Sequence, residues 1–375
     1  RLCYPVYWTP DGYYEPALDW FHKYVVTEIS EIDRTAGQSA ITTSYEYSTD
    51  GGGTDVLWAW DDSEFVKKKH RTYGQWRGYA QVTKKVGDPA SGGRLTTRKR
   101  FFRGLDDQPL PNGGKRSVVV TDSEGNTYRD HEALAGATLE EATLDGTAIV
   151  EARTTQYWTK QTASRSHTGG VDRAYLVGPS VEKTRKLLAP GAWARTEKRT
   201  TYNDDGLPLT VSDLGDVSKP GDEVCTRTTY VTNSTLWIRE TVSRVEKVAK
   251  ACDQNPSYPA DVISDVKTYY DGSETHGSAP TRGLVTREDT LDSWNGGPVY
   301  TTTSRNSHDA LGRVVSKTDA RGKVTTITYT PAGPGPTTQT VTTNPLGHTV
   351  TTYQHPAWAE PTAIIDANNK RTDLE

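Results

Sequence analysis

The residues best suited to hydrolytic chemistry are three carboxylates in an aromatic stretch, Asp61, Asp62 and Glu64. Glycoside hydrolysis requires a pair of carboxyl groups on either side of the scissile bond. Adjacent residues of a strand face opposite ways, so only Asp62 and Glu64 would share a face. We therefore interpret this segment as a solvated turn beside Trp58 and Trp60, and not as a catalytic pair.

Other polar residues lack the partners that catalysis or metal binding needs. Ser166 and His167 are adjacent, but a triad would require a distant aspartate. His348 and His355 stand seven residues apart with no carboxylate framing them, which is not the spacing of a metal site. No glycine-rich phosphate loop is present. We expect no enzymatic activity, no metal and no cofactor.

The chain has three cysteines, of which two form a candidate disulfide. Cys225 and Cys252 are 27 residues apart in polar, turn-rich surroundings. A disulfide there would stabilise the fold by about 3 kcal/mol and would imply an oxidising compartment. Neither cysteine belongs to a CxxC pair, so a zinc site is not expected. Cys3 is left over.

Composition favours sheet that is wet on at least one face. Only 33% of the 375 residues are hydrophobic, yet 20 Tyr and 10 Trp and a net charge of −4 argue against disorder. Abundant Thr, Val and Tyr, with 33 Gly and 20 Pro, are typical of strands and tight turns. A pI near 6.1 gives no reason to expect nucleic acid as a partner. We find no apolar run of about 18 residues, so we expect no transmembrane helix.

The C-terminal region contains a degenerate repeat of the form Asx-x-x-Gly. Its four copies begin at Asp309, Asp319, Asn344 and Asp366, and their fourth residues are Gly312 (followed by Arg313), Gly322, Gly347 and Asn369. The last three fourth residues are spaced by 25 and 22 positions. Such a period indicates one supersecondary unit copied along the chain.

We interpret each copy as a hairpin turn between strands. The Asx side chain bonds the downstream backbone, and Gly supplies a positive φ. Three Thr-rich strands ending in tyrosine fit this interpretation, namely 228–230, 267–270 and 325–329. A lone hairpin is marginal in water, so consecutive hairpins must pair edge to edge. The predicted fold is all-β: a long antiparallel hairpin array that curls into a hollow shell, with few short helices.

Three regions are expected along the chain. Residues 1–115 form an aromatic-rich β region, residues 116–195 a transition region with a short helix around Leu139 to Leu144, and residues 196–375 the repeats. The absence of any Met indicates a piece of a longer chain, so we expect the array to continue beyond residue 375.

The C-terminal units resemble the YD repeats of RHS proteins. The best match runs from His308-Asp309 through Gly312-Arg313 to Asp319 and Gly322, and looser copies begin at 202 and 269. The block from Arg71 to Tyr79 is similar to the stretch before the repeats in B subunits of insecticidal toxin complexes and in secreted actinobacterial RHS proteins.

The resemblance implies a secreted or cell-surface scaffold. Such proteins form a large β-shell around a C-terminal toxin of the same polypeptide, as polymorphic toxins do. The partners of this chain would be that toxin domain and neighbouring shell segments. The self-cleaving aspartate site that the family carries in its C-terminal core is not found here.

A different class of function remains an alternative. Exposed aromatic side chains stack on sugar rings, so the chain would then be a carbohydrate- or cell-wall-binding adhesin that contacts cell-surface glycans. Its candidate residues are Trp158, Trp193, Trp237, Trp294 and Trp358.

Overall fold

The chain divides into two compact units. The structure is a computed structural model that describes residues 2–35, 37, 40–48, 58–87, 93–110, 114–189 and 191–374. Unit 1 comprises Arg1–Gly206 and Asp213–Asp222, and unit 2 comprises Leu207–Ser212 and Glu223–Glu375. Strand β15 (Pro208–Asp216) has residues in both. The region boundaries expected at residues 115 and 195 stay a prediction.

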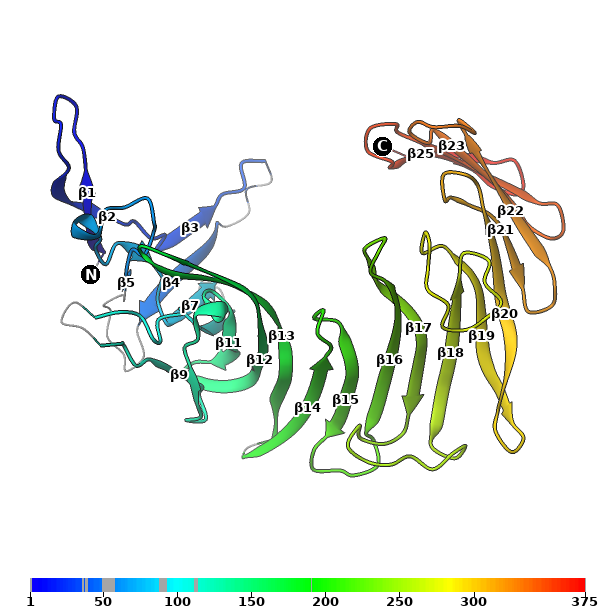
Figure 1. Cartoon of the computed structure of the whole chain (residues 1–375), viewed down its shortest axis with the longest axis horizontal. Helices are drawn as coiled ribbons and strands as arrows, with labels where there is room; N and C mark the ends of the chain where they lie inside the picture. Colours follow the sequence, from blue (N-terminus) through cyan, green and yellow to red (C-terminus); the bar gives the residue numbers. More distant parts are fainter. Residues whose placement is uncertain are drawn as a thin grey trace. The chain divides into compact units, whose positions relative to one another are not determined.

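The main sheet of unit 1 is antiparallel throughout its described pairs, in the order β3-β4-β7-β8-β11-β12-β13-β14 (Figure 1). Its strands are β3 (Glu28–Glu31), β4 (Ile41–Ser48), β7 (Gln81–Val86), β8 (Leu95–Phe101), β11 (Thr138–Asp145), β12 (Ala148–His167), β13 (Gly170–Ala189) and β14 (Ala192–Tyr202).

Three small hairpins accompany this sheet. They are β1 (Cys3–Trp8) with β2 (Ala17–His22), β5 (Trp58–Ala59) with β6 (Gln75–Trp76), and β9 (Val119–Thr121) with β10 (Thr127–Arg129). Aromatic stacking joins the first two, since the rings of Tyr4 and Trp58 lie 4.6 Å apart and those of Trp58 and Trp76 5.0 Å apart. The aromatic residues of this region therefore hold the hairpins together.

The hydrophobic core lies in unit 1, under the β9–β10 hairpin. It contains Phe102, Val120, Leu134 and Leu139. The fully buried Asp130 sits beside it and accepts backbone hydrogen bonds from residues 103, 104 and 105 at 2.6, 2.8 and 3.1 Å. A carboxylate that satisfies three buried N–H groups fixes the loop after β8 against the hairpin.

The helix expected around Leu139 to Leu144 is wrong, because this segment is strand β11. Its Leu and Glu residues suit a helix locally, but β8 and β12 pair with it on both sides. The described helical elements of unit 1 are two 3-10 turns, η1 (Lys68–His70) and η3 (Glu132–Leu134). A short helical turn does therefore occur in the transition region, seven residues before the expected start (139 minus 132).

Unit 2 consists of antiparallel strands that follow one another in chain order from β16 to β26 (green to red in Figure 1). They are β16 (Val224–Asn233), β17 (Ile238–Val248), β18 (Val262–Tyr270), β19 (Val285–Trp294), β20 (Pro298–His308), β21 (Val314–Asp319), β22 (Val324–Thr330), β23 (Gln339–Thr343), β24 (Thr349–Gln354), β25 (Pro361–Ile365) and β26 (Arg371–Asp373). The predicted all-β fold with a long antiparallel array is confirmed.

Strands β20 and β22 of unit 2 alternate between partly covered and exposed side chains. Along β22 every second residue is exposed, and none of its residues is fully buried. Apolar alternation with one wet face is what the composition predicted. In the described part of the chain, no helix has the length and apolar character needed to span a membrane.

A disulfide joins the start of β16 to the loop after β17. Cys225 is fully buried and bonded to Cys252, while Cys3 is a free, exposed cysteine. In register Cys225 is opposite Val248, which is also fully buried, so the covalent bond ties the loop to one of the buried parts of unit 2.

We predict one reactive thiol, that of Cys3, when the unreduced chain is unfolded in urea and treated with a thiol reagent. Replacing both Cys225 and Cys252 with serine should lower the free energy of unfolding by about 3 kcal/mol, because the unfolded chain gains loop entropy. The Cys3→Ser variant is the control and should unfold like the unmodified chain. Three reactive thiols before reduction would contradict the pairing.

Candidate functional site

The predicted repeat turns share one hydrogen-bond geometry. In each, a side-chain oxygen of the first residue accepts from the N–H groups two and four residues later, at 2.8–3.0 Å. The N–H of the fourth residue donates to the carbonyl of the first at 2.9–3.0 Å. The turns begin at Asp309, Asp319, Asn344 and Asp366. The Asx side chain thus closes the turn while the backbone closes the hairpin.

The fourth residue of each turn has a positive φ. The angles are 86° at Gly312, 73° at Gly322 and 84° at Gly347. Asn369 takes the same conformation with φ 59°. Asn is tolerated in the left-handed region better than most side chains, so the substitution keeps the turn.

The same turn also occurs in unit 1, outside the four repeat copies. Asp122 accepts from the N–H groups of Glu124 and Asn126, both at 2.9 Å, and φ of Gly125 is 88°. The sequence from Asp122 to Gly125 has the Asx-x-x-Gly pattern, which predicts a turn at this place. Its hairpin, β9–β10, lies over the core of unit 1 and not within a run of repeats.

The tyrosines that end the Thr-rich strands bond the preceding strand. The hydroxyl of Tyr230 donates to a carbonyl of β15, that of Tyr270 to β17 and that of Tyr329 to β21, at 2.9, 2.7 and 2.9 Å. Tyr202 makes the same bond to β13 at 2.7 Å. This recurring bond explains why a tyrosine, and not a phenylalanine, follows the threonines.

The looser repeat copy at residue 269 contains an unusually well-bonded carboxylate. Asp271 accepts the backbone N–H groups of residues 281 to 284 at 2.7, 2.9, 3.1 and 2.9 Å. Burial raises the pKa of Asp271, but these bonds outweigh it and lower the pKa to about 2. These hydrogen bonds hold residues 281–284 against the end of β18.

Arg313, which follows the first repeat glycine, extends the turn contacts outward. Its Nε donates to Asp309 at 2.7 Å, and its guanidinium lies 4.5 Å from the ring centroid of Tyr329. It also donates to the carbonyls of Pro331 and Ala332 at 3.2 and 2.7 Å. This arginine holds the proline-rich insertion after β22 against the turn.

One face of unit 2 has buried carboxylates paired with arginines. Glu246, Asp265 and Asp289 are 6%, 3% and 3% exposed. Arg244 donates to Asp265 at 2.8 Å and to Glu246 at 3.0 Å. Breaking such a pair leaves a buried charge without compensation, which is strongly destabilising.

The pKa values of Asp265 and Asp289 on this face are below the usual value for an aspartate. The hydrogen bond from Arg287 lowers the pKa of Asp289 to about 2. Burial, followed by the hydrogen bond to Asp265, raises the pKa of Tyr300 to about 12. Carboxylates held in this state accept hydrogen bonds but do not donate protons near neutral pH, so this face is suited to structure and not to acid catalysis.

The five tryptophans proposed to stack on glycans each face a side chain of this chain. The partners are Tyr202 for Trp158, Arg185 for Trp193, Arg239 for Trp237, Tyr258 for Trp294 and His355 for Trp358. Only Trp237 and Trp358 among them are well exposed, at 76% and 72%.

The carboxylates Asp62 and Glu64 of the aromatic stretch have different surroundings. Glu64 is bound by Arg165 at 2.8 Å, and Asp62 lines a pocket of unit 1. His167 has an acid near it, Asp172 at 3.1 Å, but its Nδ1 accepts from the N–H of Gly169 at 3.0 Å. With both ring nitrogens engaged, it has none left to take a proton from Ser166.

His348 and His355 each have a contact with a residue close in sequence. Nδ1 of His355 accepts from the N–H of Ala357 at 3.2 Å, and Nδ1 of His348 lies 3.5 Å from the amide nitrogen of Asn344. Within the described residues, no group of three or more His, Cys, Asp or Glu side chains is arranged so that it could hold a metal ion.

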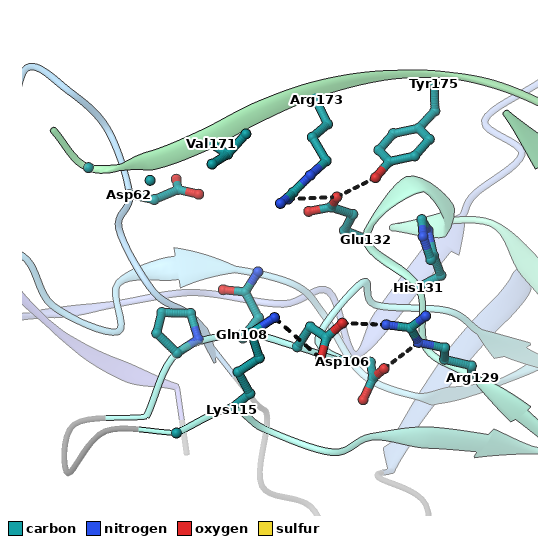
Figure 2. Close-up of a pocket in the computed structure, with 15 residues that line it drawn as sticks. Asp62, Asp106, Gln108, Lys115, Arg129, His131, Glu132, Val171, Arg173 and Tyr175 are labelled. Atoms are coloured by element: carbon teal, nitrogen blue, oxygen red, sulfur yellow. Dashed lines mark hydrogen bonds and ion pairs between the residues drawn. The ribbon is translucent and has the colours of Figure 1, made fainter. Parts of the chain in front are cut away.

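A polar pocket of about 520 Å³ lies in unit 1 between η3, the start of β13 and the loop before β9 (Figure 2). The labelled side chains of its wall are Asp62, Asp106, Gln108, Lys115, Arg129, His131, Glu132, Val171, Arg173 and Tyr175. Both signs of charge line it.

The acids of this pocket are bonded within it. Arg129 binds Asp106 at 2.5 Å and also pairs with Asp107, and its hydrogen bond holds the pKa of Asp106 below the usual value. Glu132 accepts from the hydroxyl of Tyr175 at 2.6 Å (Figure 2). The contacts of Glu132 with Arg173 and Tyr175 fasten η3 to β13.

Comparison with known proteins reveals similarity of fold. No protein-family model matches the chain, and no curated protein is similar to it in sequence. The crystal structure of TcdB2-TccC3-Cdc42 is similar with a TM-score of 0.62 and 11% identity, over 95% of this chain and 22% of that chain. TcdB2-TccC3-TEV gives 0.61 and 12% over the same shares, and TcdB2-TccC3 gives 0.56 and 10% over 90% and 21%. The chain thus shares its fold with about a fifth of those longer chains.

We predict that Tyr270→Phe lowers the free energy of unfolding by about 1 kcal/mol, because the buried carbonyl of Val242 loses its donor. Urea denaturation measures the change. Tyr14→Phe is the matched control, since Tyr14 is fully exposed. Equal stability of the two variants would show that the hydroxyl bond contributes nothing.

We also predict that stability falls in acid between about pH 4 and pH 2. The pKa values of Asp271 and Asp289 are about 2 in the folded chain, below the usual aspartate value of 3.8. The folded state therefore binds fewer protons, so the contribution of these groups is complete above pH 4 and is lost as the pH falls through the folded value. Urea midpoints measured across this range should fall less steeply in Asp271→Asn than in the unmodified chain. An identical slope would exclude Asp271 as a source of the effect.

Proposed function

We propose that this chain is a non-enzymatic structural segment of an RHS-type shell that encloses or presents a C-terminal toxin of the same polypeptide. The observation that carries the proposal is the repeated turn, which joins consecutive antiparallel strands with one hydrogen-bond geometry. Turns of this kind extend a sheet hairpin by hairpin without adding a core. The fold similarity to the TcdB2-TccC3 crystal structures supports it.

The strand pairing and the polar side chains of unit 2 are suited to a structural barrier. Paired strands leave few free edges for a protease to unravel. A face with threonines and bonded ion pairs offers a guest polypeptide no hydrophobic core on which to fold. Enclosure would then act by steric exclusion, and the partners would be the toxin domain and neighbouring shell segments.

We further propose that the protein acts outside the cytoplasm, as a secreted or cell-surface protein of the actinobacterial RHS type. The disulfide between Cys225 and Cys252 supports an oxidising environment. The three regions at 1–115, 116–195 and 196–375 would be an N-terminal β region, a transition region and the repeats.

Limited proteolysis of the gene-encoded polypeptide that contains this chain tests the proposal. We expect the segment C-terminal to the array to resist cleavage until the array is unfolded in urea. The Asp271→Ala variant should expose that segment at lower urea than Tyr14→Phe does, because it removes the acceptor of four backbone hydrogen bonds. Cleavage of the C-terminal segment before the array would contradict enclosure.

The alternative, a glycan-binding adhesin, rests on the exposure of Trp237 and Trp358. Each has one ring face on a partner of its own chain and would use the other for a sugar. A glycan array with Trp237→Ala and Trp358→Ala separates the two functions. Binding that both substitutions abolish would favour the adhesin, whereas the scaffold predicts no binding by any form.

A further inference from the structure

Four arginines of unit 1 lie on one face of the sheet beneath the β9–β10 hairpin. In register, Arg98 of β8 is opposite Ala142, Ala142 is opposite Ala152, and Ala152 is opposite Arg185. Arg195 of β14 follows Arg185 in the same row. Arg100 is two residues from Arg98 and shares its face, because side chains alternate along a strand.

Three of these arginines have acidic partners. Arg100 pairs with Glu140 at 3.5 Å. Arg185 and Arg195 both bind Glu124, at 2.6 and 2.7 Å. The contacts of Glu124 hold the β9–β10 turn against the sheet. Both glutamates near the row, Glu124 and Glu140, are therefore already paired with arginines.

The third acid near the row, Asp122, already accepts hydrogen bonds from its own turn. Asp122 uses its oxygens inside the turn, accepting from the backbone of residues 124 and 126, from the Asn126 amide and from the Tyr128 hydroxyl. Four arginines therefore face three carboxylates. The charge of Glu140 acts on Arg98 but is shared with Arg100, and among the described residues Arg98 is the arginine of this row that has no ion pair.

Arg98 lines an open pocket with its guanidinium poorly satisfied. Its Nε is buried and has no hydrogen-bond partner among the described residues. Burial lowers the pKa of Arg98, and the charge of Arg100 lowers it further. The pocket has a volume of about 680 Å³ and is also lined by Thr121, Thr147 and Trp193.

We propose that this pocket binds a small oxyanion, a carboxylate or a phosphate, at Arg98. A guanidinium presents a planar fork that binds either group through two parallel hydrogen bonds. An anion in the pocket would pair with the guanidinium of Arg98 from its open side and offset the excess positive charge. Trp193 and Ile149 supply an apolar wall along which the remainder of an organic acid would lie.

The site is separate from the proposed shell function. Its residues belong to β8, the β9–β10 hairpin, the β11–β12 turn and β14, all in unit 1 and all outside the repeats of unit 2. If limited proteolysis contradicts encapsulation, the proposal of an anion site still stands. If no anion binds, the proposal of a shell still stands.

Isothermal titration calorimetry of the whole chain with inorganic phosphate and with acetate, at constant ionic strength, tests the proposal. We expect saturable binding of at least one of the two at a single site, and the anion that binds identifies the source. Arg98→Gln should weaken this binding by about tenfold or more, as expected for the loss of a charge-assisted hydrogen bond. Arg98→Lys should fall between, because it keeps the charge without the fork.

Arg153→Gln is the matched control, because Arg153 is exposed on the opposite face of the same sheet and pairs with Glu182. It should bind the anion as the unmodified chain does. Without anion, Arg98→Gln should unfold at the same temperature as the unmodified chain or higher, because it removes an uncompensated charge; a lower temperature would assign Arg98 a structural role instead. Absence of saturable binding to both anions, or equal binding by Arg98→Gln, would overturn the proposal.

Discussion

Backbone hydrogen bonding between neighbouring antiparallel strands is the interaction on which the rest of this structure depends. In unit 2 few apolar side chains are buried, and strands such as β22 have no fully buried residue. Each strand must therefore obtain its stability from the strands beside it, because a single hairpin is marginal in water. The turn that joins two strands sets their register, so a turn that closes in one way every time keeps the array regular.

Polar side chains take over the role that a hydrophobic core has elsewhere. Tyrosine hydroxyls bond the preceding strand, and buried acids such as Asp265 are held by arginines such as Arg244. A network of this kind specifies register, since a slip of one residue would turn every acid away from its arginine. It also keeps this face charged.

The two units are stabilised in different ways. Unit 1 has a compact apolar cluster around Phe102 and Leu139, with a hairpin clamped over the sheet by arginines. Unit 2 repeats hairpins in chain order. The shared turn geometry at Asp122 and Asp309 shows that one local structure serves both, once as a cover and once as a repeating connection.

The sequence by itself determined what depends on neighbouring residues: the Asx turns from Asp309 onward and the all-β character, because turn chemistry and strand propensity act over a few positions. Only the tertiary structure decided what depends on partners far along the chain. The segment at Leu139 became a strand because β8 and β12 flank it. The unpaired Nε of Arg98 and the stacked face of Trp158 likewise follow from strand register, which brings together residues that local sequence does not relate.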